Sequence, residues 1–498
     1  MKGKILGIFG LLIVLCAFMS FATSDPWYNI GSSNFLQAGN IQNLLSRTAL
    51  YGILGIGVSF VIISGGIDLS IGSMVCLSGV LLAMFLHVEY RAPVSGTVTA
   101  VSASESSITT ATPIPQLQPG DQIRYSGGRR AATGLFTVES VNGTVVTVRE
   151  PLSRDDVQGE IARTVPIRQV ERLGGEGDAH GARIVIAGDH DLRRRDQLTL
   201  VHPTSGLKTE EITAVERSES ETTVFIRNDP GDRLTDEWLA IPLKRHQRMP
   251  VPVALLTVLA IAGCLGLIHG LLVTRARLQP FVVTLCGLLI YRGLSRWLTD
   301  DNPAGFGEYA DGLAQLGSGR LTVYSDSAGE TFGIPFPFFF LAVIGIVAAV
   351  VLNRTIWGRY LLALGRNEEA ARFSGINTGR VTLMAYVICT SMAAVGGMLF
   401  ALDSLSISPS SFGNFFELYA IAAAVLGGCS LRGGEGSIVG VVIGTAVMQI
   451  LNNLIVLLKI SGSLEFAIIG SVILIGVLAD EIVKRIAAQR RLKKRLSG

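Results

Sequence analysis

Long apolar segments occupy both ends of the chain, whereas its middle alternates apolar and polar residues. A helix of about 20 apolar residues crosses a hydrocarbon core of roughly 30 Å. Ten segments are predicted to span a membrane: 4–22, 48–65, 70–88, 251–273, 280–299, 335–353, 382–402, 415–431, 436–457 and 464–482. The pattern therefore predicts an all-α polytopic membrane protein, with transmembrane helices in residues 1–88 and 250–498.

Residues 89–249 separate the third and fourth predicted spans and follow a different pattern. Alternating Val, Thr and Ile, interrupted by turn residues, is typical of β-strands. Phe136–Arg149 resembles Ile212–Arg227, and each follows a similar stretch, Asp121–Tyr125 or Asp196–Leu200. This weak repeat predicts an inserted β-rich soluble domain made of one or two small barrels or sandwiches.

Local motifs in the insert predict one turn and no metal site. Asn142-Gly143 predicts a two-residue hairpin turn, because both residues tolerate positive φ. Histidines and aspartates gather in one polar stretch, at His180, Asp189, His190 and Asp191. Their spacing does not match a regular metal-ligand pattern. The insert is either an insertion tolerated at a loop tip or a docking surface for a partner outside the membrane.

Basic residues in the short loops predict the orientation, because Lys and Arg prefer the cytoplasmic side. With the N-terminus inside, the loops 274–279 and 354–381 and the C-terminal tail are cytoplasmic. They hold Arg275, Arg277, Arg354, Arg359, Arg366, Arg372, Arg380, Arg490, Arg491, Lys493, Lys494 and Arg495. The loop 300–334 on the other side holds Asp300, Asp301, Glu308, Asp311, Asp326 and Glu330 against Arg320.

This orientation predicts that both termini are cytoplasmic and that the insert is periplasmic. Lys2 and Lys4 precede the first apolar segment, so a cleaved signal peptide is the alternative for that segment. An uncleaved first span is preferred because it completes the orientation.

The composition is typical of a membrane protein rather than a soluble one. Apolar residues make up 49% of the chain and charged residues 16%, against about a quarter charged in soluble proteins. A net charge of +3 gives no indication of nucleic-acid binding. The cysteines lie in or beside apolar runs, which favours small buried side chains over disulfides or metal ligands. They are Cys16, Cys76, Cys264, Cys286, Cys389 and Cys429.

One cytoplasmic stretch predicts a short amphipathic helix between the sixth and seventh spans. Asn367 is a good N-cap, Glu368 and Glu369 favour the positive end of a helix dipole, and Gly375 can end the helix. The stretch comprises Gly365, Arg366, Asn367, Glu368, Glu369, Ala370, Ala371, Arg372, Phe373, Ser374, Gly375 and Ile376. Such a helix either lies at the membrane surface or transmits movement from a cytoplasmic motor to the spans.

A second motif interrupts the apolar run between the second and third spans. Gly65 and Gly66 precede Asp68 and Ser70, and either polar residue can cap the helix that follows. A carboxylate at the centre of a transmembrane helix costs about 2.5–3.5 kcal/mol. Asp68 is therefore expected near an interface or a wet cavity, as part of a structural turn or of the solute path.

Further polar groups are predicted at membrane depth. Arg292 and Arg296 belong to the fifth span, and Asn452 and Asn453 belong to the ninth. Each either pairs with a neighbouring helix, reaches the interface, or lines the path. The glycine-rich stretch Gly427–Gly436 joins the eighth and ninth spans, and its glycines permit a tight reversal.

These blocks together resemble the permeases of ribose-, xylose- and galactose-type ABC importers. The resemblance rests on Gly65-Gly-Ile-Asp-Leu-Ser70, on His269-Gly-Leu-Leu-Val273 and on Gln279-Pro-Phe-Val-Val-Thr-Leu285 with Arg292-Gly293. Gly358–Ile376 and Gly427–Gly436 extend it. The blocks fall in the family's order and cover essentially everything outside the insert.

The resemblance implies a ten-helix subunit of the bacterial inner membrane that works as a dimer, with itself or with a sister permease. It implies a periplasmic sugar-binding protein outside and an ABC ATPase inside, with Gly365–Ile376 as the coupling helix seated in that ATPase. The 89–249 insert departs from the family, whose third and fourth spans are joined by a short loop. We expect it to flank or replace part of the docking surface for the binding protein.

The energy source is expected to be a separate subunit. The chain has no Gly-x-x-x-x-Gly-Lys-Ser/Thr phosphate loop, so ATP and Mg are assigned to the partner and this chain is predicted to bind no cofactor and not to be an enzyme. Two alternatives are a branched-chain amino acid permease of the same architecture and a membrane-anchored adhesion or signalling protein that uses the β insert.

Overall fold

The computed structural model describes residues 2–25, 29–127, 134–153, 155, 158–173, 181–202, 206–218, 220–227, 238–307, 310–325, 331–465, 467, 468, 470, 471, 474 and 478. The chain forms two compact units. The first, here called the membrane unit, comprises Met1–His87 and Met249–Gly498, and the second, the insert unit, comprises Val88–Arg248.

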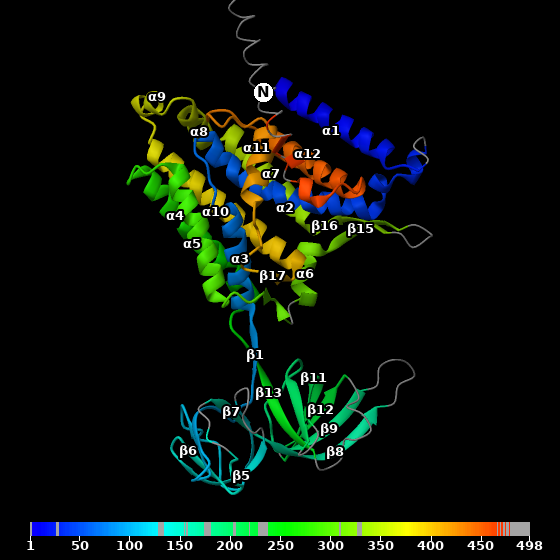
Figure 1. Cartoon of the computed structure of the whole chain (residues 1–498), viewed down its shortest axis with the longest axis vertical. Helices are drawn as coiled ribbons and strands as arrows, with labels where there is room; N and C mark the ends of the chain where they lie inside the picture. The colour runs from blue at the N-terminus through cyan, green and yellow to red at the C-terminus, as the bar shows by residue number, and fades with distance from the viewer. Residues whose placement is uncertain are drawn as a thin grey trace, which may run out of the picture. The chain divides into compact units, whose positions relative to one another are not determined.

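The membrane unit is built almost entirely of helices (Figure 1). They are α1 (Lys2–Ala22), α2 (Ala38–Ile63), α3 (Ile71–Leu86), α4 (Val251–Thr274), α5 (Pro280–Leu298), α6 (Ala310–Ser318), α7 (Phe336–Arg354), α8 (Ile356–Arg366), α9 (Glu368–Phe373), α10 (Thr378–Ser404), α11 (Phe416–Leu426) and α12 (Ile438–Leu457). Short 3₁₀ turns lie at Ile30–Ser32, Asn34–Leu36 and Gly462–Leu464. Two small strand pairs complete it, β14 (Ala304–Gly305) with β17 (Ser406–Ile407) and β15 (Arg320–Ser325) with β16 (Thr331–Pro335).

Helix α2 forms the centre of the membrane unit. It contacts α7, α10, α11 and α12, and 83% of its most apolar window is buried. For α4, α5 and α7 the corresponding fractions are 22%, 28% and 22%, so these helices present apolar side chains outward. Apolar side chains that the rest of the unit leaves uncovered suit a lipid environment.

The number of spans is smaller than predicted among the described residues. There, six helices are long and apolar enough to cross a membrane, namely α2, α4, α5, α7, α10 and α12. Three further apolar helical segments are too short to be counted with these. They are Leu6–Ala22 within α1, Ile71–Leu86, which is α3, and Phe416–Leu426, which is α11. The tenth predicted span, 464–482, lies mostly outside the described residues.

The eighth predicted span, 415–431, differs most clearly from the structure. Helix α11 has only 11 residues, which corresponds to about 16 Å. Phe415 adopts a left-handed conformation with φ of 66° at its start, and Gly427 caps its end. The apolar run correctly predicts a buried segment. The run is longer than the helix, however, because the residues at both ends of the helix form turns.

The insert unit consists of strands, as its alternating pattern predicts. They are β1 (Val88–Arg91), β2 (Ser95–Ser102), β3 (Ser107–Thr110), β4 (Gln122–Gly127), β5 (Gly134–Asn142), β6 (Val145–Val148), β7 (Gly159–Arg163), β8 (Val165–Leu173), β9 (Gly181–Ala187), β10 (Gln197–His202), β11 (Gly206–Arg217), β12 (Glu221–Ile226) and β13 (Leu239–Gln247). Strands β2-β3-β6-β5-β4-β7 close into a barrel, and β1-β13-β10-β11-β12-β9-β8 form a seven-stranded sheet. Each has its own apolar core, around Ile108 and Ile123 in the barrel and around Ile184 and Leu198 in the sheet.

The internal repeat is confirmed by equivalent hydrogen bonds. In the barrel, Val138 N donates to Asp121 O at 2.8 Å, and in the sheet Ile212 N donates to Asp196 O at 2.8 Å. The Asp121 side chain accepts from Gln118 N at 2.9 Å, and that of Asp196 accepts from Arg193 N at 2.7 Å. The repeated unit is therefore a strand followed by a hairpin, β4-β5-β6 in one half and β10-β11-β12 in the other.

The predicted turn at Asn142-Gly143 is displaced by one residue. Asn142 pairs with Val145 at the end of β5, so Gly143 and Thr144 form the two-residue loop. Gly143 has φ of 63°, whereas Asn142 is not in the positive-φ region. A hairpin whose first turn residue is a positive-φ glycine requires no special conformation of the asparagine.

The two ends of the insert unit are paired with each other. Strands β1 and β13 are antiparallel, with Val88 opposite Gln247 and Glu89 opposite His246. Arg248 Nη2 donates to Glu89 Oε1 at 2.7 Å, and Arg91 also donates to Glu89. The chain therefore enters and leaves this unit at adjacent points.

Candidate functional site

The short helix predicted within Gly365–Ile376 is present as α9, a helix of 6 residues. Asn367 Oδ1 accepts from Ala370 N at 2.9 Å, so the predicted N-cap is confirmed. Arg372 Nη2 donates to Glu368 Oε1 at 3.2 Å across one turn. Gly375, with φ of 82°, follows the end of the helix as predicted, because a positive φ there permits the C-terminal turn.

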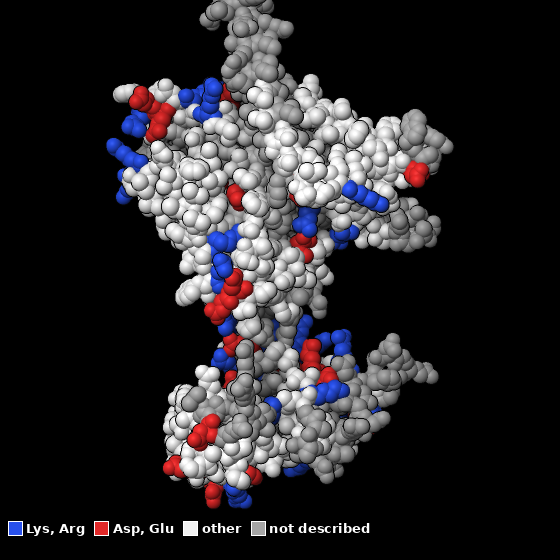
Figure 2. Space-filling model, in the orientation of Figure 1, with Lys and Arg blue, Asp and Glu red and all other residues white. Residues whose placement is uncertain are grey.

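Helix α9 presents most of its side chains outward. Ala371 is buried, whereas Phe373 is 91% exposed and Glu368 and Glu369 are also exposed. Figure 2 shows that the visible face of the membrane unit is mostly uncharged and that charged side chains gather around α8 and α9. Phe373 therefore lies on the surface of the membrane unit, between charged residues.

Helix α8, which the sequence interpretation treated as loop, joins α9 to the interior. Gly434 N donates to Ile63 O at 2.8 Å. A Cβ atom at Gly365 would lie 1.9 Å from Ile63 O and 2.3 Å from Gly434 N. The end of α8, the end of α2 and the α11–α12 loop therefore meet backbone to backbone. We call this contact of Gly365, Ile63 and Gly434 the glycine junction.

The glycine junction continues directly into the α2–α3 turn. Gly65 has φ of 88° and precedes a stretch without regular secondary structure that leads through Asp68 to α3. Gly433 lies against the same turn, since a Cβ atom there would be 3.0 Å from Gly65 N. Motifs that are distant in sequence thus form one continuous region.

Asp68 and Ser70 are both completely buried. Ser70 donates twice to Asp68 Oδ1, from its backbone N at 2.9 Å and from its Oγ at 2.7 Å. Ser70 occupies the N-cap position of α3, but its side chain accepts no hydrogen bond from that helix. The predicted side-chain cap by Asp68 or Ser70 is therefore wrong, because the two side chains bond to each other instead.

Residues that the sequence interpretation did not single out lie against the α2–α3 turn. Tyr291 Oη and His269 Nε2 are 2.8 Å apart, and His269 lies edge to face with Tyr386 at 6.3 Å between ring centroids. A Cβ atom at Gly287 would lie 2.6 Å from His269 Nε2 and 3.3 Å from Ser70 Cβ, and one at Gly66 would lie 2.7 Å from Tyr386 Oη. In the sequence interpretation, His269 appears only as part of the His269-Gly-Leu-Leu-Val273 motif. A histidine within an apolar span is the sequence feature that could have identified it as a candidate functional residue.

Arg292 binds main-chain carbonyls. Its Nη1 donates to Pro409 O at 3.0 Å and to Phe412 O at 2.7 Å. These bonds attach α5 to the turn region before α11. The predicted alternative was pairing with a neighbouring helix, whereas the partners are carbonyls of a turn.

The two asparagines of α12 differ from each other. Asn453 exchanges hydrogen bonds with Asn40 of α2, at 2.7 Å and 3.2 Å between amide nitrogen and oxygen. Asn452 has a buried Oδ1 without a hydrogen-bond partner. Asn453 thus matches the predicted helix–helix pairing.

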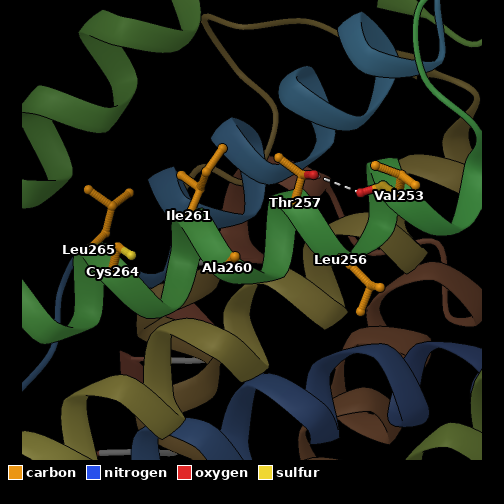
Figure 3. A pocket seen from close by; sticks show the side chains of 7 residues that line it. All are labelled: Val253, Leu256, Thr257, Ala260, Ile261, Cys264 and Leu265. Carbon is orange, nitrogen blue, oxygen red and sulfur yellow. Dashed lines mark hydrogen bonds between the residues drawn. The ribbon is translucent and has the colours of Figure 1, made fainter.

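A shallow groove of about 530 Å³ runs along α4. Figure 3 shows its lining side chains, Val253, Leu256, Thr257, Ala260, Ile261, Cys264 and Leu265. The hydroxyl of Thr257 already donates to Val253 O at 2.7 Å. The groove therefore suits apolar chains and lacks the hydrogen-bonding groups that a sugar requires.

A polar pocket of about 220 Å³ lies where α2 begins and α10 ends. Its lining residues are Asn43, Ser46, Arg47, Ser318, Arg320, Pro335 and Asp403. Arg320 Nη2 donates to Asn43 Oδ1 at 3.0 Å, and Arg47 Nη2 is 3.5 Å from Asp403 Oδ2. Its lining is polar, in contrast to that of the α4 groove.

Within the described ranges, no cluster of His, Cys, Asp and Glu could hold a metal ion. His190 Nε2 is 2.9 Å from Ala187 O, and Asp191 pairs with Arg217 and Lys244 at 2.8 Å and 3.1 Å. The hydrogen bonds from these cationic partners hold the pKa of the exposed Asp191 carboxyl below its usual range, and Lys244 has a larger effect than Arg217. His180 lies outside the described residues.

Comparison with known proteins adds to this geometry. The profile of a family described as branched-chain amino acid transport system, permease component, matches residues 234–478. The ribose import permease protein RbsC of Escherichia coli is 36% identical over 230 residues, which cover 46% of this chain and 68% of that protein. The chain belongs to the sugar ABC permease family.

Two other relatives of this permease are also named as sugar import permeases. The ribose import permease protein RbsC of Bacillus subtilis is 38% identical over 213 residues, covering 43% of this chain and 62% of that protein. The galactose/methyl galactoside import permease protein MglC of Escherichia coli is 32% identical over 243 residues, covering 47% and 68%. No solved structure matches this permease. It is a multi-pass membrane protein and a transport subunit.

Proposed function

We propose that this permease forms the transmembrane pathway of an ABC importer for a monosaccharide. The single observation that carries the coupling mechanism is the exposed surface of α9, joined to the interior through the glycine junction. ATP binding by a separate ATPase subunit moves α9, and the junction transmits that movement to α2 and the α2–α3 turn. The relatives named as ribose and galactose import permeases support a sugar as the solute.

The complete assembly follows from the same proposal. Two permease chains, identical or sister, enclose the path, and a periplasmic binding protein delivers the sugar to the outer side. ATP and Mg are bound by the partner ATPase. Ten spans in a bacterial inner membrane place both termini and the 354–381 loop in the cytoplasm and residues 89–249 in the periplasm.

Coupling residues are assigned from exposure and contact. Phe373, Glu368 and Glu369 contact the ATPase, because they are exposed and lie on one short helix. The capped and ion-paired geometry of α9 keeps this surface rigid, which a mechanical link requires. Gly65, Gly66, Asp68 and Ser70 transmit the movement inward.

Truncation of the exposed aromatic tests the proposal. Phe373→Ala, combined with Glu368→Lys and Glu369→Lys, is expected to lower ATP-dependent sugar uptake at least tenfold, the equivalent of about 1.4 kcal/mol of lost contact. Membrane insertion should be unchanged. The matched control is Phe281→Ala on α5, whose phenylalanine is also exposed. Normal uptake by the α9 variant in proteoliposomes with the ATPase would refute the coupling role.

A second candidate solute is a branched-chain amino acid, because the matching family profile carries that description. The partner binding protein separates the two candidates. Thermal stabilisation of that protein by a pentose or hexose and not by leucine agrees with the sugar proposal, and the reverse result replaces it.

A further inference from the structure

Helix α8 has one side packed into the membrane unit and one side uncovered. The buried residues are Gly358, Leu361 and Leu364. The uncovered side combines Ile356, which is 57% exposed, Tyr360, which is 41% exposed, and the exposed Arg359. Apolar and aromatic side chains mixed with arginine are typical of a helix at the boundary between hydrocarbon and headgroups.

The start of α8 is fixed to the end of α7. The chain leaves the helical conformation at Thr355, whose backbone is extended with ψ of 160°. Thr355 Oγ1 accepts from Gly358 N at 3.2 Å, which caps the start of α8. A Cβ atom at Gly358 would lie 2.2 Å from Leu352 O, so the glycine permits a close approach of the two backbones. Helix α8 is therefore held against the last turn of α7.

The position of this contact along α7 matches the edge of a hydrocarbon core. Helix α7 has 19 residues, about 28 Å, against roughly 30 Å for the core. One side of α7 is apolar and uncovered, at Val343, Ile346, Val347 and Val350. Arg354 follows Val350 by one helical turn on the same side and is exposed. The uncovered apolar stripe of α7 thus ends at an arginine, directly before α8.

The charges on and around α8 are positive. Residues 331–367 contain three arginines and neither Asp nor Glu. Among the residues that the structure describes, the guanidinium groups of Arg354 and Arg359 have no ion-pair or hydrogen-bond partner. Arg372 of α9 differs, because it donates to Glu368. Two exposed arginines without a counter-ion are complementary to an anionic surface.

We propose that α8 lies in the headgroup layer of the membrane and binds anionic phospholipids through Arg354 and Arg359. The guanidinium groups donate to phosphate oxygens, while Ile356 and Tyr360 reach the boundary of the hydrocarbon core. A lipid is favoured over a protein as the partner because these arginines continue the uncovered apolar stripe of α7. Anionic lipids attract arginines that lie within about a Debye length of the membrane surface.

Lipid binding at α8 bears on coupling, because α8 connects α7 to α9. Gly365 of α8 belongs to the glycine junction, so lipid bound to α8 holds one member of that junction in place. This regulatory role rests on the proposed coupling function. It predicts that sugar uptake per ATP hydrolysed falls when anionic lipid is left out, while ATP hydrolysis persists.

A lipid titration of the purified permease in detergent tests the binding without a transport assay. Phosphatidylglycerol and phosphatidylcholine are compared by the concentration that gives half of the rise in unfolding temperature. The wild type should prefer phosphatidylglycerol. Arg354→Gln with Arg359→Gln should lower that preference at least about fivefold, the equivalent of about 1 kcal/mol. Arg354→Lys with Arg359→Lys keeps both charges and should keep most of the preference.

The matched control is Arg372→Gln, which removes an exposed arginine that is already paired with Glu368. It should leave the lipid preference unchanged, and high salt should weaken the preference of the wild type. An unchanged preference in the glutamine double variant, or an equal loss in Arg372→Gln, would overturn the lipid surface. An unchanged preference together with a changed oligomeric state would assign the two arginines to a second permease chain instead.

Transport is measured separately, in proteoliposomes that contain the ATPase, with and without phosphatidylglycerol. Uptake per ATP hydrolysed should depend on phosphatidylglycerol in the wild type and not in the glutamine double variant. The same dependence in both would overturn the regulatory role. Normal uptake by the α9 triple variant would remove the coupling function and leave the lipid titration unaffected, so the two failures are distinguishable.

Discussion

At the scale of single residues, steric contact decides which glycines matter. Gly365 lies against the Ile63 carbonyl so closely that any side chain would displace one of the backbones. Gly345 of α7 is also helical, but the nearest atom to a Cβ atom there is Ile56 Cδ1 at 3.8 Å. Two glycines in neighbouring helices therefore have different roles, which their sequence context does not distinguish.

Substitution of these glycines gives a paired prediction. Gly365→Ala is expected to destabilise the permease by about 1–3 kcal/mol and to reduce sugar uptake, because the added Cβ atom separates α8 from α2. Gly345→Ala should be nearly neutral in both assays. Thermal unfolding in detergent and uptake in proteoliposomes measure the effects. Equal behaviour of the two variants would show that the glycine junction is not tightly packed.

At the scale of elements, charge and hydrogen bonding hold the two ends of the insert unit together. Glu89 on β1 accepts from Arg248 and Arg91, which hold the pKa of its carboxyl below the usual range, Arg248 most strongly. The Glu89 side chain is partly exposed, so solvent screens the interaction and the contribution is modest.

The lowered pKa fixes the direction of a pH effect. A carboxyl whose pKa is depressed by folding contributes stability above its unfolded pKa, near 4.3, and loses it as pH falls through the folded value. Glu89→Gln should therefore lower stability at neutral pH by about 0.2–1 kcal/mol, with a smaller difference in strong acid and in high salt. Denaturant unfolding of the whole chain at both pH values measures this. A difference that grows in acid would contradict the assignment.

The short helices α9 and α11 show when the local sequence is sufficient to predict where a helix begins and ends. The cap of α9 depends on residues within four positions of each other, and Asn367, Ala370 and Gly375 adopt the predicted geometry. The length of α11 depends instead on Phe415, whose left-handed conformation cannot be inferred from an apolar run. Local hydrogen bonds can be predicted from spacing, whereas the ends of buried helices depend on their surroundings.

At the scale of the whole molecule, the insert unit is a self-contained addition to the membrane unit. Its apolar cores are composed of its own residues, and its two ends are paired as β1 and β13. Directly opposed residues of antiparallel strands are about 5 Å apart, which a two-residue turn can connect.

Excision is therefore expected to leave both units folded. Joining Val88 to Gln247 through Asn-Gly should give a membrane unit with an unchanged unfolding temperature, and residues 88–248 alone should be soluble and rich in β-structure by circular dichroism. A fragment that ends at His202 is the control, because it lacks β11, β12 and β13 and should not fold. Aggregation of the complete insert fragment would contradict its independence. A loss of uptake after excision would favour a docking role for the insert.

The amino-acid sequence by itself determined the membrane character, the β-rich insert with its repeat, the capped helix α9 and the family motifs, because each depends on composition or on contacts between near neighbours. Only the tertiary structure decided that Gly365, Ile63 and Gly434 meet, and that the α2–α3 turn lies against His269 and Tyr386. It likewise decided that Asn453 pairs with Asn40. These contacts join residues far apart along the chain, and helix packing selects such partners among many chemically equivalent ones.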